Sequence, residues 1–534
     1  MTRKTFSLAI DIGGTFTDVV LDQNGKQTTT KVLTRYDAPE VGVMDGIASV
    51  LVKSGIVDPG TTGEALPIDC LAGAKRIIHG TTLATNALIE RKGAKTALIT
   101  TKGHRDTLEM AHENRFAQYD INVDRAAPLV PRHLRFPVEE RMDKDGKIRL
   151  PLAVEDVERL IPDLRSQQVE SVAIGLLHAY ANPANEMVIE ESLRQALPDL
   201  AITRASEVCP EIREYERQST AVANAYVQPL MAKYLTGLKK AVAAAGAECP
   251  FFLMTSAGGL CDLETAIRFP IRLVESGPAG GVILASTVAR QINAEEVMAF
   301  DMGGTTAKLC LIDEGKPLMS RTFEVDRSYR FQRGSGLPIR VPVIELVEIG
   351  AGGGSIAHVD QLGRIQVGPG SAGSTPGPAC FDRGGEEPCV TDANVMLGRL
   401  DVSRFAGGSF ALNIERAAKA IERQIASPAH LTELLAAHAV SEIVEENMAN
   451  AARVHATEWG REVEARTLIA FGGGAPLHAA HVANKLGLSH VVIPANAGVG
   501  SAVGFLQAPL SFEVVRSRHK PATEVSGEWL TELM

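Results

Sequence analysis

The 534-residue sequence lacks most of the motifs that would assign it directly to an enzyme class. It contains no G-x-x-x-x-G-K-[ST], which excludes a P-loop, and no G-x-S-x-G, which leaves a serine hydrolase without support. It also has no H-E-x-x-H and no Cys/His spacing typical of zinc. His478 and His481 lie three residues apart on a predicted helix. Because no acid or third ligand is evident beside them, we expect satisfied or exposed histidines there and not a metal site.

Cysteines are few, and the 54 basic residues are outnumbered by 64 acidic ones. The seven cysteines are scattered and odd in number, and none forms a C-x-x-C pair, so we expect reduced thiols in a cytosolic protein. No apolar signal region precedes the first predicted strand, and no uninterrupted apolar run reaches membrane-spanning length, so we expect no membrane association. The net charge of −10 argues against nucleic-acid binding, which needs a basic face.

One literal G-x-G-x-x-G occurs, at residues 368–373, but it does not predict a dinucleotide site. Pro369 lies inside it, and Ser374 to Pro378 follow where the helix of that motif should begin. This segment and the glycine-rich residues 348–355 either line a ligand cleft or form structural turns.

What the sequence does contain is a glycine-rich hairpin that occurs twice. Residues 11–18, DIGGTFTD, join two short apolar runs, and residues 301–308, DMGGTTAK, repeat the pattern in the second half of the chain. Paired glycines allow a positive φ and let a ligand approach the backbone, so their free N–H groups would form an anion cradle. Acids beside such a cradle usually serve a hydrated Mg²⁺. The two hairpins therefore predict two related domains that hold a polyphosphate and its metal from both sides of a cleft.

Three further segments are candidates for ligand contacts. Residues 79–88, HGTTLATNAL, predict a strand end, a polar turn and a helix start, which suits an oxyanion or carbonyl ligand. Helix capping by the polar residues of this turn explains the same pattern equally well. Residues 111–120 form either a substrate lid or a solvated loop. The turn at residues 471–478, FGGGAPLH, enters a helix and offers flat backbone against which an adenine could lie.

The order of predicted elements indicates an α/β fold. Strands alternate with helices up to about residue 203, where the first domain is expected to end. We place a second domain at 204–510 and a short tail at 511–534. The charged residues 214–217 are expected on the solvated face of a long helix. Small residues at 275–282 suit a crossover between the domains, or ordinary tight packing.

The two hairpins resemble the phosphate hairpins of the actin, sugar-kinase and heat-shock-chaperone ATPase superfamily. With the later motifs in order, the chain more specifically resembles the hydantoinase A / 5-oxoprolinase family, which includes the ATP-binding subunits of acetone and acetophenone carboxylases. The resemblance runs from about Ser7 to about Ser517 and rests on seven ordered stretches: DIGGTFTD (11–18), HGTTLATNAL (79–88), EIREYERQSTAVANAYVQP (211–229), ESGPAGG (275–281), DMGGTTAK (301–308), GAGGGSI (350–356) and GPGSAGSTPGPAC (368–380).

The sequence departs from this family at three places. Residues 471–477 are FGGGAPL where the family usually has FGGAGPL, and residues 255–257 are Thr-Ser-Ala where it usually has Gln-Ser-Asn. Such subunits usually continue beyond the position of Met534, so the usual C-terminal domain is expected to be absent.

The resemblance implies two actin-like, ribonuclease H-like ATPase domains that face each other across a nucleotide cleft. It implies ATP- and Mg²⁺-dependent hydrolysis of a cyclic amide, such as hydantoin, N-methylhydantoin, 5-oxoproline or a related lactam, through phosphorylation of the carbonyl oxygen. Water attack on the activated species would need a hydantoinase B-like subunit, and hence a hetero-oligomer. Two alternatives stay open: an ATP-using subunit of a ketone carboxylase, and a non-catalytic ATP-sensing protein.

The resemblance also implies roles for individual residues. Asp11 and Asp301 would act in catalysis and hold Mg²⁺ through water, and Lys308 would neutralise developing charge unless it is merely a surface lysine. The phosphates would meet Gly13, Gly14, Thr15, Thr17, Gly303, Gly304, Thr305 and Thr306. The adenosine would lie against Gly472, Gly473 and Gly474. The substrate would meet Thr81, Thr82, Asn86, Asn114 and Arg115.

Overall fold

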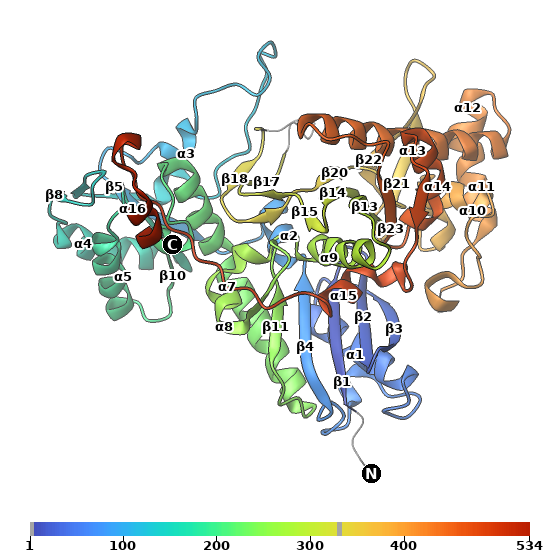
Figure 1. Ribbon diagram of the computed structural model, residues 1–534, viewed down its shortest axis with the longest axis horizontal. Helices are drawn as coiled ribbons and strands as arrows, with labels where there is room; N and C mark the ends of the chain where they lie inside the picture. The colour runs from blue at the N-terminus through green and yellow to red at the C-terminus, as the bar shows by residue number, and fades with distance from the viewer. Residues whose placement is uncertain (1–4, 328–333, 409, 534) are drawn as a thin grey trace.

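A computed structural model describes residues 5–327, 334–408 and 410–533 (Figure 1). Its first sheet has six strands in the order β12-β11-β4-β1-β2-β3. The central strand β1 is almost wholly buried and apolar, as expected for a strand covered on both faces. The bounds are β1 (Phe6–Ile12), β2 (Phe16–Gln23), β3 (Lys26–Leu33), β4 (Ala74–Thr81), β11 (Phe251–Met254) and β12 (Leu260–Asp262).

The second sheet repeats this plan. Its order is β15-β14-β13-β23-β24, and β20 also pairs with β14. In both sheets an antiparallel hairpin (β1-β2 or β13-β14) is flanked on one side by a third antiparallel strand and on the other by parallel strands. The hairpins predicted at 11–18 and 301–308 are therefore confirmed. The bounds are β13 (Glu296–Met302), β14 (Ala307–Asp313), β15 (Lys316–Pro317), β20 (Val347–Ile349), β23 (Thr467–Phe471) and β24 (His490–Val492).

A smaller, parallel sheet lies at the left of Figure 1, in the order β10-β9-β5-β6. It is formed by segments that follow β4 and precede the long helix α7 (Glu214–Ala244), which packs on β9. Because β11 and β12 come after α7 and yet complete the first sheet, that sheet extends past the predicted boundary at residue 203. The bounds are β5 (Thr96–Thr101), β6 (Arg135–Val138), β9 (Ser171–Gly175) and β10 (Ala201–Arg204).

Helices cover these sheets, and four two-stranded ribbons decorate them. The longer helices are α1 (Pro39–Lys53), α4 (Val154–Ser166), α5 (Ala184–Ala196), α9 (Ser276–Gln291), α13 (Glu433–Glu458) and α14 (Ala475–Leu486). The shorter ones are α2 (Leu83–Ile89), α3 (Thr107–Met110), α6 (Ala205–Val208), α8 (Leu263–Arg268), α10 (Val390–Met396), α11 (Ile414–Ile421), α12 (Ser427–Ala429), α15 (Gly500–Phe505) and α16 (Gly527–Leu533). The ribbons pair β7 (Arg141–Met142) with β8 (Ile148–Leu150), β16 (Met319–Ser320) with β19 (Val343–Ile344), β17 (Phe323–Val325) with β18 (Leu337–Ile339), and β21 (Ser355–Val359) with β22 (Ile365–Ser371).

Two expectations about loops and charges are settled by these elements. The G-x-G-x-x-G at 368–373 lies mostly in strand β22, which confirms that it is no dinucleotide loop. The solvated face expected at 214–217 is wrong for Glu216 and Arg217, which are buried. Arg217 donates to the carbonyl oxygens of Leu176 and Glu211, because backbone groups that leave the end of β9 need partners.

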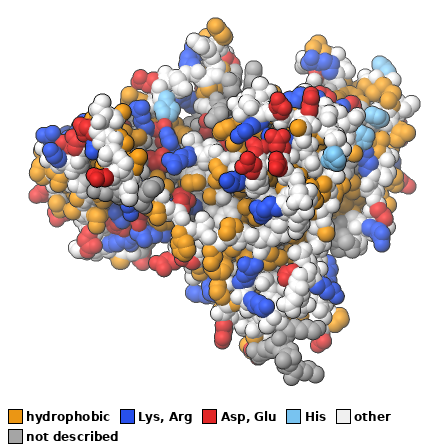
Figure 2. Space-filling model, viewed as in Figure 1, with side chains coloured by type: hydrophobic (Ala, Val, Ile, Leu, Met, Phe, Trp, Pro, Cys, Tyr) orange, Lys and Arg blue, Asp and Glu red, His pale blue; other side chains and the backbone are white. Residues whose placement is uncertain are grey.

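Helices α9 and α15 lie between the two six-stranded sheets (Figure 1). One apolar cluster joins Ala9 and Ile78 of the first sheet to Ala299 and Ile469 of the second, with Phe505 of α15 among them. The small residues predicted to serve a crossover do so, since α9 leads from the first sheet into β13. No helix in the described part of the chain is long and apolar enough to span a membrane. On the face in Figure 2, basic side chains are interspersed with acidic ones.

The contact between α9 and α15 generates a prediction about stability. A methyl group at Gly504 would overlap the carbonyl group of Gly280 and approach the backbone of Leu284 at 3.1 Å. Gly504→Ala should therefore destabilise the protein by about 1–3 kcal/mol, the usual cost of overpacking. Urea unfolding followed by circular dichroism measures it. Gly237→Ala is the matched control, because Gly237 lies within helix α7 and a methyl group there meets nothing within 4 Å. An unchanged urea midpoint for Gly504→Ala would contradict this account of the packing.

Candidate functional site

The first hairpin turns at Gly13 and Gly14, and its carbonyl groups are held by the segment after β3. The Gly13 N–H donates to the Phe16 carbonyl at 3.0 Å and closes the turn. Thr34 Oγ1 donates to the Gly13 carbonyl at 2.9 Å, and the Tyr36 hydroxyl donates to the Gly14 carbonyl. Within the described residues, the Gly14 N–H has no backbone partner. The carbonyl oxygens are thus satisfied by protein, and this N–H group is left for an anion.

The second hairpin has the same construction. The Gly303 N–H donates to the Thr306 carbonyl at 3.0 Å. The carbonyls of Gly303 and Gly304 accept from the N–H groups of Gly353 and Gly354, at 3.1 and 2.6 Å. The glycine-rich loop 350–354 is therefore the brace of the second hairpin. One expectation needs correction: the first glycine of each hairpin does not offer a free N–H group, because that group closes its own turn.

The tips of the two hairpins face each other. A Cβ atom added at Gly304 would lie only 2.8 Å from Thr15 Oγ1, and one added at Gly14 would lie 3.9 Å from Thr305 Oγ1. A side chain at Gly304 would therefore crowd Thr15, whereas one at Gly14 would make ordinary contacts. The Thr17 hydroxyl differs from these groups, since it is buried and lies 3.2 Å from Thr34 Oγ1. Its assignment to a phosphate stays a prediction, as do those of the other hairpin residues.

Two carboxyl groups, of the buried Asp11 and the half-buried Asp301, lie behind the tips. Burial, followed by repulsion from Asp18 and Asp301, raises the pKa of Asp11 to about 8. Burial raises the pKa of Asp301 to about 6, although Lys308 opposes it. Asp11 Oδ1 is buried and has no hydrogen-bond partner among the described residues. Mutually repelling carboxylates with an orphaned oxygen fit a divalent cation. The described residues contain no group of three His, Cys, Asp or Glu side chains able to hold a metal, so this cation would keep several waters.

Lys308 is not a surface lysine. Its Nζ forms an ion pair with Glu275 and lies 3.5 Å from Glu348 Oε1. Burial lowers the pKa of Lys308, but attraction to Glu275 and Glu348 outweighs burial, so the pKa lies above its usual value. Glu275 was missed among the site residues. The signal that could have found it is a lone acid directly before the small residues that start α9.

The start of α9 connects the two hairpins. Glu275, with φ +56°, pairs with Lys308 of β14. The next residue, Ser276, accepts from the Thr81 N–H at 3.1 Å and donates to the Thr81 carbonyl at 3.2 Å. A Cβ added at Gly277 would lie 3.0 Å from Asp11 Oδ1. Three consecutive residues therefore lie against both hairpins and the end of β4, and they link these parts of the site.

The turn at 79–88 uses its polar side chains to hold itself in place. Thr81 Oγ1 accepts from the Leu83 N–H at 3.2 Å at the start of α2. Thr82 Oγ1 donates to the Ile12 carbonyl at 3.2 Å, next to the first hairpin. Asn86 lies over the same turn, its Nδ2 3.5 Å from Thr82 Oγ1. These contacts favour a structural role for the two threonines. Of the three substrate residues predicted in this turn, Asn86 makes the longest of these hydrogen bonds.

The turn at Gly472, Gly473 and Gly474 braces the second hairpin. Gly472 has φ +84°, and a methyl group there would overlap the Asp301 carboxylate. The Gly474 N–H donates to the Met302 carbonyl at 2.8 Å. A methyl group at Gly473 would meet nothing within 4 Å. Gly473 is therefore the one residue of the three with open space beside it, and the assignment of this turn to an adenosine stays a prediction.

Asn114 and Arg115 contact their own loop. Arg115 donates to the Asp120 carbonyl at 2.9 Å, and the Asn114 carbonyl accepts from Arg125. Both residues are exposed on an irregular segment beyond α3. No described contact brings them to either hairpin, so their substrate role stays a prediction. The segment contains no regular structure.

His478 is a satisfied histidine, as expected. It is buried, with Nδ1 2.9 Å from Glu445 Oε1 and Nε2 3.0 Å from Asn394 Nδ2. The sequence showed no acid near it, because Glu445 comes from α13. Among the described residues neither His478 nor His481 belongs to a metal cluster.

Comparison with known proteins shows which protein family this chain is similar to. The family profile described as hydantoinase/oxoprolinase N-terminal region matches residues 7–197, and that described as hydantoinase/oxoprolinase matches residues 217–514. The caprolactamase subunit alpha of Pseudomonas jessenii is 36% identical over 516 residues, which are 96% of this chain and 72% of that protein. The 5-oxoprolinase of Saccharomyces cerevisiae is 29% identical, and the match covers 99% of this chain and 42% of that protein.

Two solved structures share the fold. The ATP-dependent caprolactamase of Pseudomonas jessenii superposes with a TM-score of 0.76 at 35% identity, over 93% of this chain and 70% of that one. A nucleotide-free acetone carboxylase superposes with a TM-score of 0.80 at 27% identity, over 94% and 70%. The fold is α/β, with two actin-like ATPase domains whose hairpins face each other, as predicted. On its profile matches and its similarity to the caprolactamase subunit, the chain belongs to the hydantoinase/oxoprolinase family.

Proposed function

We propose that this protein is the ATP-binding subunit of an enzyme that opens a cyclic amide. The observation that carries the proposal is the pair of facing hairpins, each with a free tip and a buried carboxyl group behind it. Relatives named caprolactamase and 5-oxoprolinase support the reaction class. Bound ATP would supply the phosphoryl group that turns a stable amide oxygen into a leaving group.

The residues of this chain would act mainly by positioning and by neutralising charge. The N–H groups at Gly14 and Gly304, with the Thr15 and Thr305 hydroxyls, would bind phosphate oxygens. Asp11 and Asp301 would hold a hydrated Mg²⁺. Lys308 would lower the cost of charge at the transferring group, and its two carboxylate neighbours would keep it in place.

The amide would lie beside the turn at 79–88, where Asn86 is the best placed of the predicted contacts. We propose that hydrolysis of the activated species takes place on a hydantoinase B-like partner. The subunit names of the relatives support a multi-subunit assembly. A second function, phosphorylation of a ketone in its enol form, is favoured by the structural match to acetone carboxylase.

The small molecule that accepts the phosphoryl group from ATP decides between these functions. Purified chain with a co-expressed hydantoinase B-like protein should hydrolyse ATP faster when caprolactam, hydantoin or 5-oxoproline is added. Asn86→Ala should remove that stimulation and leave basal turnover unchanged. Phosphate release and product formation, measured together, check both statements. Stimulation by acetone or acetophenone alone would favour the carboxylase function, and no stimulation by either class would favour a nucleotide sensor.

Replacing either buried carboxylate should abolish most turnover. Asp11→Asn or Asp301→Asn removes the charge that faces the cation and should lower Mg-ATP hydrolysis about 10²- to 10³-fold. The melting temperature should not fall, because each variant removes a buried, repelled carboxyl group. Asp22→Asn at the far end of the same hairpin is the control, since Asp22 accepts from the Gly25 N–H and, among the described residues, forms no other side-chain hydrogen bond. Turnover near the wild-type rate in both variants would exclude the site.

The raised pKa values predict a pH dependence. An aspartate ionises near 3.8 in an unfolded chain, but Asp11 ionises at about 8 and Asp301 at about 6 in the folded protein. The folded state thus binds more protons between about pH 4 and 8, and its stability without metal falls as the pH rises across that range.

Mg²⁺ competes with these protons, so its affinity should rise by roughly tenfold per pH unit from pH 6 towards 8. Isothermal titration with Mg²⁺ in two buffers of different ionisation enthalpy measures both affinity and proton release. Asp11→Asn should flatten most of the dependence. A wild-type affinity that does not change between pH 6 and 8 would show that these carboxyl groups do not hold the metal.

A further inference from the structure

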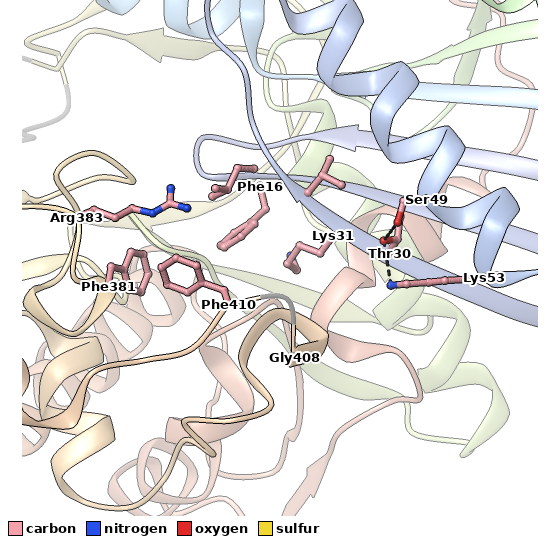
Figure 3. Close-up of a pocket in the computed structure, with 11 residues that line it drawn as sticks. Phe16, Thr30, Lys31, Ser49, Lys53, Phe381, Arg383, Gly408 and Phe410 are labelled. Carbon is pink, nitrogen blue, oxygen red and sulfur yellow. Dashed lines mark hydrogen bonds between the residues drawn. The ribbon is translucent and has the colours of Figure 1, made fainter. Parts of the chain in front are cut away.

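A cavity of about 510 Å³ lies beside the first hairpin, and the roles proposed above do not use it (Figure 3). One wall is formed by β2, β3 and α1 of the first half of the chain, starting at Phe16 directly after the hairpin tip. The other wall is formed by Phe381, Arg383, Gly408 and Phe410 of the second half. The volume lies in the range that protein sites for small organic molecules occupy, which is roughly 300–1,000 Å³.

Phenylalanine rings line part of this cavity on both walls. The ring centroids of Phe381 and Phe410 lie 5.1 Å apart on one wall, and Phe16 faces them from the other. Phe405 packs against all three, at 6.5 Å from Phe16, 5.7 Å from Phe381 and 6.0 Å from Phe410. These are edge and tilted arrangements, and Lys31 Nζ lies over the Phe16 ring, 5.1 Å from its centroid. Four of the 16 phenylalanines in the chain are gathered here, so this is a concentrated aromatic site.

The charged side chains of the cavity are all basic. The Arg383 guanidinium lies 4.7 Å from the Phe410 ring centroid and is directed towards Phe16 in Figure 3. It forms no ion pair with any residue that the structure describes. Lys31 is already paired with Asp18 at 2.6 Å, and Lys53 donates to Thr30 Oγ1 at 3.1 Å. No Asp or Glu is among the described residues that line the cavity.

We propose that this cavity binds a small organic carboxylate with a planar apolar body. The carboxylate would pair with Arg383, whose planar fork matches it, and the body would lie between Phe16 and Phe410. Such a ligand would touch both halves of the chain at once. A nucleotide has a planar ring and negative charge as well, so the test must separate a carboxylate site from an extension of the ATP site.

Phenylacetate is the probe, and its neutral analogue 2-phenylethanol is the comparison. Titration of the full chain followed by ligand-detected NMR should show phenylacetate binding at least about tenfold more tightly than the alcohol, because only the acid forms a charge-assisted bond. Arg383→Gln should weaken phenylacetate by about the same factor and leave the alcohol unchanged. Phe410→Ala should weaken both ligands.

Arg404→Gln is the matched control, because Arg404 lies on the same segment, carries the same charge and does not line the cavity. It should bind phenylacetate like the wild type. Saturating Mg-ADP should not displace the probe. Equal affinity for acid and alcohol, equal loss in the two arginine variants, or displacement by Mg-ADP would each overturn the proposal. Since Arg383 is exposed, its variant should keep the wild-type circular dichroism spectrum.

Discussion

The close approach of the two hairpin tips is the constraint on which the rest of the site depends. Thr15 lies so near Gly304 that no side chain fits between them. For the tips to meet in this way, each hairpin must be held from behind. Thr34 and Tyr36 take the carbonyl groups of the first, and the loop at 350–354 takes those of the second. The backbone N–H groups at the tips are thereby left for a ligand.

The same closeness brings like charges together. The buried Asp11 and the half-buried Asp301 lie near each other, and the cost of this arrangement is visible in their raised pKa values. Shifted pKa values of this kind cluster at functional sites, and positive charge would relieve the repulsion. Lys308 supplies part of that positive charge, but Glu275 and Glu348 already share it. The balance therefore fits a site that is completed by a metal ion and its phosphate ligand.

Helix α9 couples the site to the body of the protein. Its first residues touch both hairpins and the turn after β4, while its glycines allow α15 and Phe471 to pack closely against it. Movement of one half of the chain would be felt at all three contacts. The aromatic cavity lies at another junction of the two halves, with Phe16 and Lys31 on one side and Phe381 and Phe410 on the other.

Much of this architecture follows from the sequence alone. The two hairpins and the turn at 471–478 are encoded locally, by apolar runs that end in consecutive glycines. The turn at 79–88 is encoded by an apolar run that ends in small and polar residues, and the α/β class by the alternation of strands and helices. Other features were decided only in the tertiary structure: the brace at 350–354, the burial of Lys308 by Glu275 and the close approach of Gly472 to Asp301. So were the return of β11 and β12 to the first sheet and the burial of Arg217. Each of these depends on contact between segments far apart in the chain, and a single sequence records the composition of such segments but not which of them meet.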